Sequence, residues 1–212
     1  VAIGRLALSA STDGADNIAI GRSALAVSGN DGDTNIAIGL AALGTGDVAG
    51  AGNIGLGASA LTALTSGTNN IAMGLTSADA LLSGTDNVAI GRLAFSASTD
   101  GADNIAIGRS ALAVSGNDGD TNIAIGLAAL GTGDVAGAGN IGIGASALTA
   151  LTSGTNNIGI GLTAADALLS GTDNVAIGRL ALSASTDGAN NVAIGLSALA
   201  VSGNDGDSNV AI

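Results

Sequence analysis

The chain has 212 residues, a formal net charge of −12 and only twelve residue types. Lys, His, Glu, Gln, Pro, Cys, Trp and Tyr are absent, so no imidazole, thiol or lysine amine can act as a general base, a nucleophile or a soft metal ligand. These absences exclude most enzyme chemistry, and we expect a protein that is not an enzyme.

The charge balance also restricts the partners of the chain. All seventeen acidic residues are Asp, the five basic residues are Arg, and the sequence pI is near 4.1, which argues against nucleic acid and against anionic membrane surfaces. The stretch from Val48 to Ala78 has no charged residue, but it contains six Gly and lacks the roughly 18 consecutive apolar residues of a membrane span. We expect no nucleic-acid partner and no membrane insertion by this segment.

A short motif recurs along the whole chain at intervals of seventeen or eighteen positions. It consists of Asn, a β-branched residue, a small residue, an aliphatic residue and Gly, as in residues 17–21, 35–39, 53–57, 70–74 and 87–91. Five motifs form a unit of 87 residues, and residues 1–87 differ from residues 88–174 at only five positions. Residues 175–212 begin a third unit, so we predict a single repetitive segment over 1–212. Because no capping coil is evident, we expect it to be a fragment of a longer chain.

Each motif predicts a short β-strand, because large and small residues alternate with period 2. We expect the large side chains, such as Ile18 and Ile20, to point into the protein and the small residue between them to point outward. The small residue and Leu that follow the Gly, such as Ala24 and Leu25, predict a second short strand that returns over the first. The remaining residues are Gly, Ser, Thr, Asn and Asp, which are typical of turns.

A single repeat with three large apolar side chains cannot fold alone, but it can fold when it is stacked on copies of itself. The sequence therefore predicts an all-β fold, a parallel β-solenoid of about twelve coils with roughly 17–18 residues in each coil. The Asn column is expected to be structural, with stacked amides that hydrogen-bond along the solenoid axis and to the turn backbone. The Gly after each strand is expected to provide a turn that a Cβ atom would hinder.

The column of small residues predicts an oligomer interface. An outward strip of Ala and Gly would allow close approach of another β-surface and would be an apolar patch that requires a partner. We therefore expect lateral homo-oligomerisation through Ala19, Ala37, Gly55, Ala72, Ala89, Ala106, Ala124 and Gly142.

At these residues the sequence resembles the head repeats of trimeric autotransporter adhesins, the YadA-like surface proteins of Gram-negative bacteria. The signature recurs at residues 16–24, 34–42 and 86–94, and the resemblance covers the whole chain. It implies a left-handed parallel β-roll, a homotrimer and a role in adhesion or autoagglutination at the bacterial cell surface. The repeat in those heads is shorter by three or four positions, so the present coils imply longer outer loops. Related repeats occur in phage tail fibres and other bacterial fibre proteins.

A second solenoid family shares a shorter motif with the chain. Residues 20–25 fit the hexapeptide pattern of left-handed β-helix acyltransferases. Only one hexapeptide fits in each coil, however, and acyl transfer in that family depends on a His that this chain lacks. The resemblance to the adhesin heads is therefore preferred, and the acyltransferase activity is not expected.

Clusters of Asp are the only candidates for metal chemistry. The sequence Gly-Asn-Asp-Gly-Asp recurs at residues 29–33, 116–120 and 203–207, and it resembles oxygen-rich loops that hold Ca²⁺. The calcium candidates are Asp31, Asp33, Asp118, Asp120, Asp205 and Asp207. No bidentate Glu is present, and a solvated turn is the simpler interpretation. No other cofactor is expected.

The Arg residues also follow the repeat. Arg5 and Arg22 occupy one column in neighbouring coils, as do Arg92 and Arg109. Stacked guanidinium groups repel each other, so we expect each to meet an Asp, either from a turn of its own chain or from an adjacent protomer.

Together these observations predict a non-catalytic extracellular fibre segment, the adhesive head or spacer of a bacterial surface adhesin. Its partners would be copies of itself and a host or surface ligand. The alternative is a purely structural subunit of an extracellular filament or phage-type fibre without a specific receptor.

Overall fold

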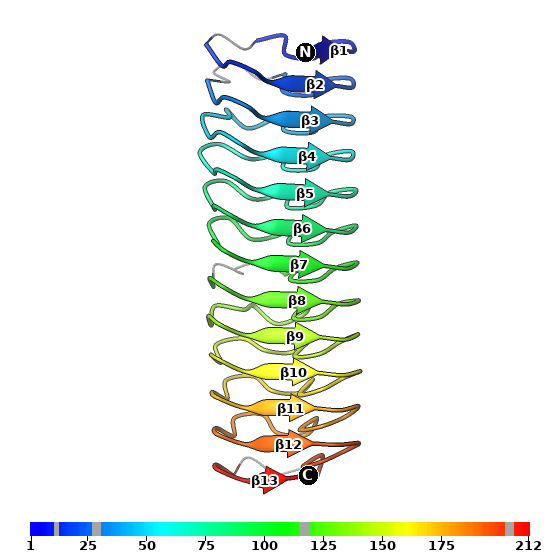
Figure 1. Ribbon diagram of the computed structural model, residues 1–212, viewed down its shortest axis with the longest axis vertical. Coiled ribbons are helices and arrows are strands. Elements are labelled where there is room, and N and C mark those ends of the chain that lie inside the picture. The colour runs from blue at the N-terminus through cyan, green and yellow to red at the C-terminus, as the bar shows by residue number, and fades with distance from the viewer. Residues whose placement is uncertain (11–12, 27–30, 115–118, 202–205) are drawn as a thin grey trace.

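The computed structural model of the chain describes residues 1–10, 13–26, 31–114, 119–201 and 206–212. Within them the protein is all-β, with a single parallel sheet in which every strand pairs with the preceding and the following strand in sequence order (Figure 1). The successive coils stack into an elongated β-solenoid of about twelve turns. The predicted parallel β-solenoid is therefore confirmed.

The strands are short and equally spaced along the chain. Their bounds are β1 Ala2–Ile3, β2 Ile18–Ile20, β3 Ile36–Ile38, β4 Ile54–Leu56, β5 Ile71–Met73, β6 Val88–Ile90, β7 Ile105–Ile107, β8 Ile123–Ile125, β9 Ile141–Ile143, β10 Ile158–Ile160, β11 Val175–Ile177, β12 Val192–Ile194 and β13 Val210–Ala211. Pairing is in register throughout, so equivalent residues of neighbouring coils lie side by side. In the pairing of β6 with β7, for example, Val88 faces Ile105, Ala89 faces Ala106 and Ile90 faces Ile107.

Backbone hydrogen bonds run along the solenoid axis both inside and outside the strands. At β6, the Val88 N–H donates to the Asn104 carbonyl at 2.8 Å, and the Gly91 N–H donates to the Met73 carbonyl at 2.8 Å. Beyond the strand, the Phe95 N–H donates to the Ala111 carbonyl at 2.9 Å. Each coil thus satisfies the backbone groups of its neighbours above and below, as buried amides require.

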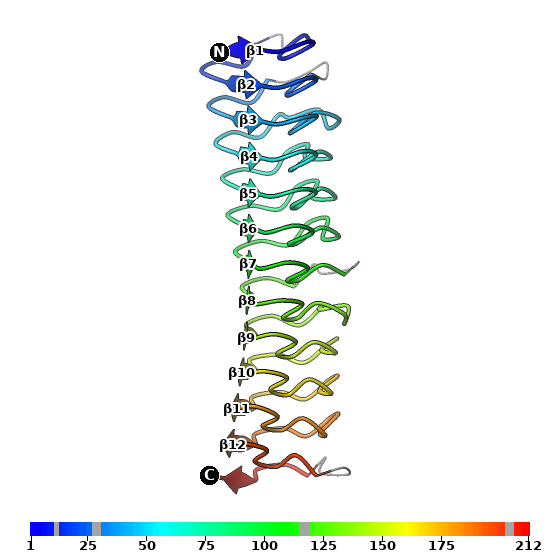
Figure 2. The same ribbon diagram turned by 90° about the vertical axis from the view of Figure 1, so that its right-hand side faces the viewer.

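The segment after each Gly is not the second strand that the sequence predicted. It contains two left-handed residues separated by one other residue, as at Leu93 (φ 58°) and Phe95 (φ 53°). This alternation turns the chain back on itself within three residues, which an extended strand cannot do. Figure 2 shows the result, a compact winding on the side of the coil opposite the strands.

The core is a narrow interior that is filled mainly by the residues of this return segment. Leu61, Phe95, Leu112 and Leu148 are each at most 1% exposed. Where the return segment carries Ala78 in place of Leu, Leu81 enters the interior three residues later and is fully buried. Leu64, at the equivalent position of the preceding coil, is also fully buried, so the interior of these coils is filled from two positions.

The Gly that ends each strand has a conformation that other residues avoid. At Gly57 the φ angle is +135°, and a Cβ atom placed there would lie 2.4 Å from the carbonyl oxygen of Gly74 in the next coil. In the same coil, Gly55 shows no positive φ, and a Cβ atom at that position would lie 3.3 Å from the Ala60 carbonyl oxygen.

These two glycines provide a matched pair. We expect Gly57→Ala to lower the free energy of unfolding by about 3 kcal/mol, because it adds a backbone clash to an unfavourable φ. Gly55→Ala is expected to cost less than about 1 kcal/mol, because neighbouring coils carry Ala at this position. Urea unfolding of both variants followed by circular dichroism checks this; equal midpoints would contradict the role assigned to Gly57.

Candidate functional surfaces

A continuous column of buried Asn side chains runs along the inside of the coil, directly before each strand. The Asn87 Nδ2 donates to the Gly101 carbonyl at 2.7 Å and to the Asn70 Oδ1 at 2.9 Å. Its own Oδ1 accepts the Asn104 N–H at 3.0 Å. Contacts of this kind recur from coil to coil, and the Asn side chains from Asn17 to Asn191 in this column are at most 5% exposed. The predicted structural role of this column is confirmed.

The small residue in the middle of each strand lies inside the coil and not on its outer surface. The proposed interface residues Ala19, Ala37, Ala72, Ala89, Ala106 and Ala124 are at most 1% exposed, and Gly55 and Gly142 are also buried. The predicted orientation of the strand was therefore wrong. These eight residues are enclosed within one chain and cannot contact another copy.

The packing of the return segment explains why this column must be small. A Cβ atom at Gly55 would lie 3.5 Å from the Leu43 Cδ1, and one at Gly159 would lie 2.9 Å from the Leu148 Cγ. Large Leu side chains from the return segment thus press directly on the inner face of the strands. A larger residue there would overfill the interior.

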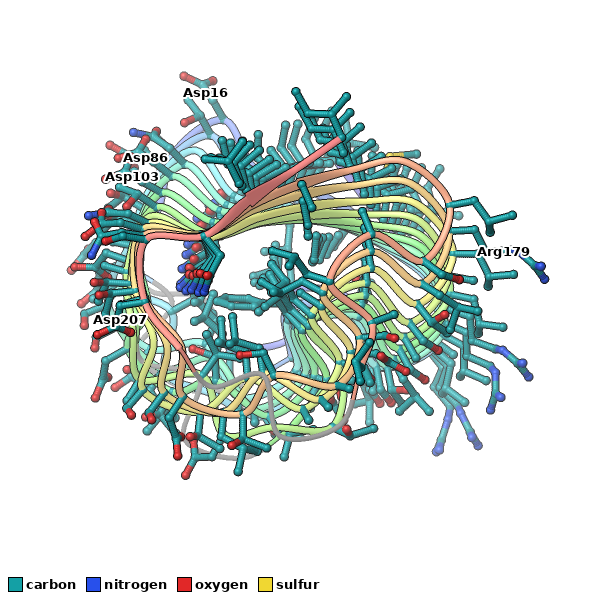
Figure 3. All side chains as sticks on the ribbon, turned by 90° about the horizontal axis from the view of Figure 1, so that it is seen from below. Asp16, Asp86, Asp103, Arg179 and Asp207 are labelled. Carbon is teal, nitrogen blue, oxygen red and sulfur yellow. The ribbon has the colours of Figure 1, made fainter. Side chains whose placement is uncertain are left out.

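The large residues at both ends of each strand consequently point outward. We call this surface the aliphatic face: the first and third residues of β2 to β12. The first residues are half-buried by their neighbours, and several of the third residues are more exposed, as for Met73 (39%), Ile90 (36%) and Ile177 (37%). The view along the axis in Figure 3 shows these side chains stacked in rows on the outside of the sheet. The result is an apolar strip that follows the solenoid over its length.

Half of the calcium candidates have a different role in the structure. Asp33, Asp120 and Asp207 each accept a backbone N–H from the preceding coil, from Ala15, Ala102 and Ala189, at 2.6–2.8 Å. Asp31 is exposed, and Asp118 and Asp205 lie outside the described residues. No group of three or more potential ligand side chains occurs within the described ranges. Calcium binding stays a prediction.

Two other carboxylates are half-buried. The Oδ1 atoms of Asp79 and Asp166, equivalent positions in the two 87-residue units, are buried without a hydrogen-bond partner. Burial raises the pKa of both carboxyl groups above the ordinary value, and a backbone hydrogen bond at each residue opposes this only in part. Their ionised forms therefore destabilise the fold at neutral pH.

The part of the chain that the structure describes offers no enclosed binding site. No pocket is found among its residues, and it includes no helix with the length and hydropathy of a membrane span.

No protein-family model, curated protein or solved structure gives a significant match to the chain.

The raised pKa values give a testable pH dependence. For a carboxyl group with a raised pKa in the folded state, protonation favours folding, so the destabilisation is present at neutral pH and disappears as the pH falls below the ordinary value of 3.8. We expect the Asp79→Asn, Asp166→Asn double variant to have a higher urea midpoint than the wild type at pH 7 and an equal one at pH 3.

The control for this experiment is the double variant Asp47→Asn, Asp134→Asn. These residues are also equivalent in the two 87-residue units, and their side chains are exposed. Their replacement removes the same number of negative charges without relieving a buried carboxylate. Equal stabilisation by both double variants would show that only the net charge matters.

Proposed function

We propose that the chain is a non-catalytic segment of an extracellular fibre, the head or spacer of a bacterial surface adhesin, and that it assembles with copies of itself as a homotrimer. The observation that carries this proposal is the aliphatic face. The aliphatic face is continuous over β2 to β12, unlike the singly scattered apolar residues of an ordinary soluble surface, and continuous apolar surfaces are usually covered by a partner.

The regularity of the aliphatic face favours a second copy as the partner. Its side chains repeat with the spacing of the coils, about 4.8 Å. Another solenoid of the same chain has the same repeat and can therefore match the face at every coil. A globular partner has no such period and would cover only part of the strip.

The absence of most chemically reactive residue types supports a role in attachment or structure over a role in catalysis. The resemblance of the Asn-Val-Ala-Ile-Gly motifs to adhesin head repeats supports the bacterial surface as the location. The purely structural filament is the second candidate. It is favoured by the near-identity of residues 1–87 and 88–174, because a filament needs repetition and no distinct binding site.

The assembly is tested by adding charge to the aliphatic face. The triple variant Ile90→Lys, Ile125→Lys, Ile177→Lys places charged groups on three exposed strand positions, and burying them against another copy would be unfavourable. In light scattering we expect the wild type at three times the chain mass of 19.6 kDa and the variant at the mass of one chain, with unchanged circular dichroism.

A matched control is Ser83→Lys, Ser153→Lys, Ser170→Lys, which adds the same charge at exposed positions outside the strands. We expect this control to keep the assembled mass. A monomeric wild type would refute self-association.

The adhesive role needs a separate test. Cells that display the wild-type segment should attach to surfaces or agglutinate. Assembled protein that does neither would favour the structural filament.

A further inference from the structure

The two edges of the aliphatic face carry opposite charges. We call the residue directly before each buried Asn the acidic edge, and the residue directly after each strand-ending Gly the basic edge. Figure 3, a view along the solenoid axis, shows Asp16, Asp86 and Asp103 on the same side, beyond one end of the strands, and Arg179 beyond the other end. The four Asp of the acidic edge and all five Arg of the chain have exposed side chains.

The two edges match each other coil by coil. Each Asp of the acidic edge lies in a coil that has Arg on its basic edge. Where both positions are present, coils with Thr or Asn on the acidic edge carry Leu on the basic edge, and coils with Gly carry Ala. The charged coils contain Asp16 with Arg22, Asp86 with Arg92, Asp103 with Arg109, and Asp173 with Arg179. Arg5 lies in the first coil, whose acidic-edge position would precede residue 1.

The third unit shows that the two positions change together. Residues 175–212 differ from residues 1–38 at five positions. Two of them lie on the opposite edges of one coil: Asn190 replaces Asp16, and Leu196 replaces Arg22. The left-handed backbone of the acidic edge, with φ near 58° at both Asp16 and Asn190, accommodates both Asp and Asn. It therefore explains neither the loss of the charge nor the simultaneous loss of Arg.

The matched charges do not pair within the chain. Among the described residues, none of the four acidic-edge Asp carboxylates lies within 4.0 Å of an Arg guanidinium, because the strand separates the two edges. Stacking instead brings like charges together: Asp86 and Asp103 lie in neighbouring coils, as do Arg92 and Arg109. Like charges directly opposite each other in a sheet are unfavourable. A neighbour with the opposite charge at the same height would neutralise both pairs.

Symmetry determines which edges can meet between copies. When copies are related by rotation about an axis parallel to the solenoid, the acidic edge of one copy meets the basic edge of the next, and equivalent coils lie at the same height. When two copies pack antiparallel through this face, by a two-fold rotation about an axis parallel to the strands, acidic edges meet acidic edges and basic edges meet basic edges. Only in the parallel arrangement does each Asp of the acidic edge lie opposite an Arg of the adjacent copy.

We propose that Asp16, Asp86, Asp103 and Asp173 form ion pairs with Arg22, Arg92, Arg109 and Arg179 of the adjacent copy, and that these pairs fix a parallel, in-register assembly. This inference rests on the self-association proposed above and specifies its direction and register. The aliphatic face repeats in nearly the same form in every coil, so a shift by one coil would preserve its apolar contacts. Exposed ion pairs add little affinity, but a shift by one coil in either direction would leave at least two of the four Asp facing Leu, and charge complementarity of this kind favours the unshifted alignment.

The absence of Lys from the chain allows a direct test. The variant Arg92→Lys keeps the positive charge and introduces the only side-chain amine. A carbodiimide joins an amine to a carboxylate only where the two are in contact, without adding a spacer. We expect covalent oligomers on a denaturing gel, and tandem mass spectrometry should identify an amide between the introduced amine at position 92 and Asp86 as the main linkage between copies.

Two controls isolate the proposed pair. Asp86→Asn in the Arg92→Lys background should lose this linkage while light scattering still shows the assembly. Ala145→Lys introduces an amine on the basic edge, in a coil that has Gly139 on its acidic edge. In an in-register assembly the nearest acidic-edge Asp of the adjacent copy is two coils away, about 10 Å. We therefore expect no covalent oligomer from this variant.

The outcomes separate this inference from the proposed function. If the wild type assembles but the amine at position 92 links to an Asp of another coil, or to none, the register proposed here is wrong and self-association stands. If the wild type is monomeric in light scattering, both proposals fail. An assembled protein in which that amine links mainly to Asp86 supports both.

Discussion

The column of buried Asn side chains is the constraint on which the rest of the structure depends. As at Asn87, the amide donates to a turn carbonyl of the next coil and to the Asn of the preceding coil, while its oxygen accepts the backbone N–H of the next Asn. A buried amide without these partners would be strongly unfavourable. Because each Asn needs the Asn above and below it, the column permits only one alignment of successive coils, and coils that differ in length by one residue are held in the same register.

Because the coils stack in register, residues at the same position of successive repeats lie side by side and form one continuous surface. The β-branched residues of the strands become the aliphatic face, and the residues beside them become its acidic and basic edges. Differences in coil length are absorbed in the turns between return segment and Asn, away from this face. The self-association and register proposed here both derive from this regularity, because a partner with the same period can satisfy every coil at once.

Much of this architecture could be predicted from the sequence, because repetition at a fixed interval restricts the fold to a stack of coils. The parallel sheet, the structural Asn column and the turn at Gly were all predicted correctly. The orientation of the strands was not, since alternation shows that the two faces differ but not which is enclosed. One signal was present in the motif: Asn17 and Ala19 are two residues apart and share a face, so a buried Asn places Ala inside. The return segment was mistaken for a strand because left-handed Leu and Phe residues, such as Leu93 and Phe95, have no signature in composition.

Hydrogen exchange measured by mass spectrometry on the variant Asn87→Leu tests the central role of the Asn column most directly. The variant Ser83→Ala, at an exposed position of the same coil, serves as the reference. If the column holds the coils in register, Asn87→Leu loses amide protection in the coils around residues 70–104 and keeps it in distant coils, as expected for a stack stabilised by nearest neighbours. Unchanged protection around residues 70–104 would contradict the account.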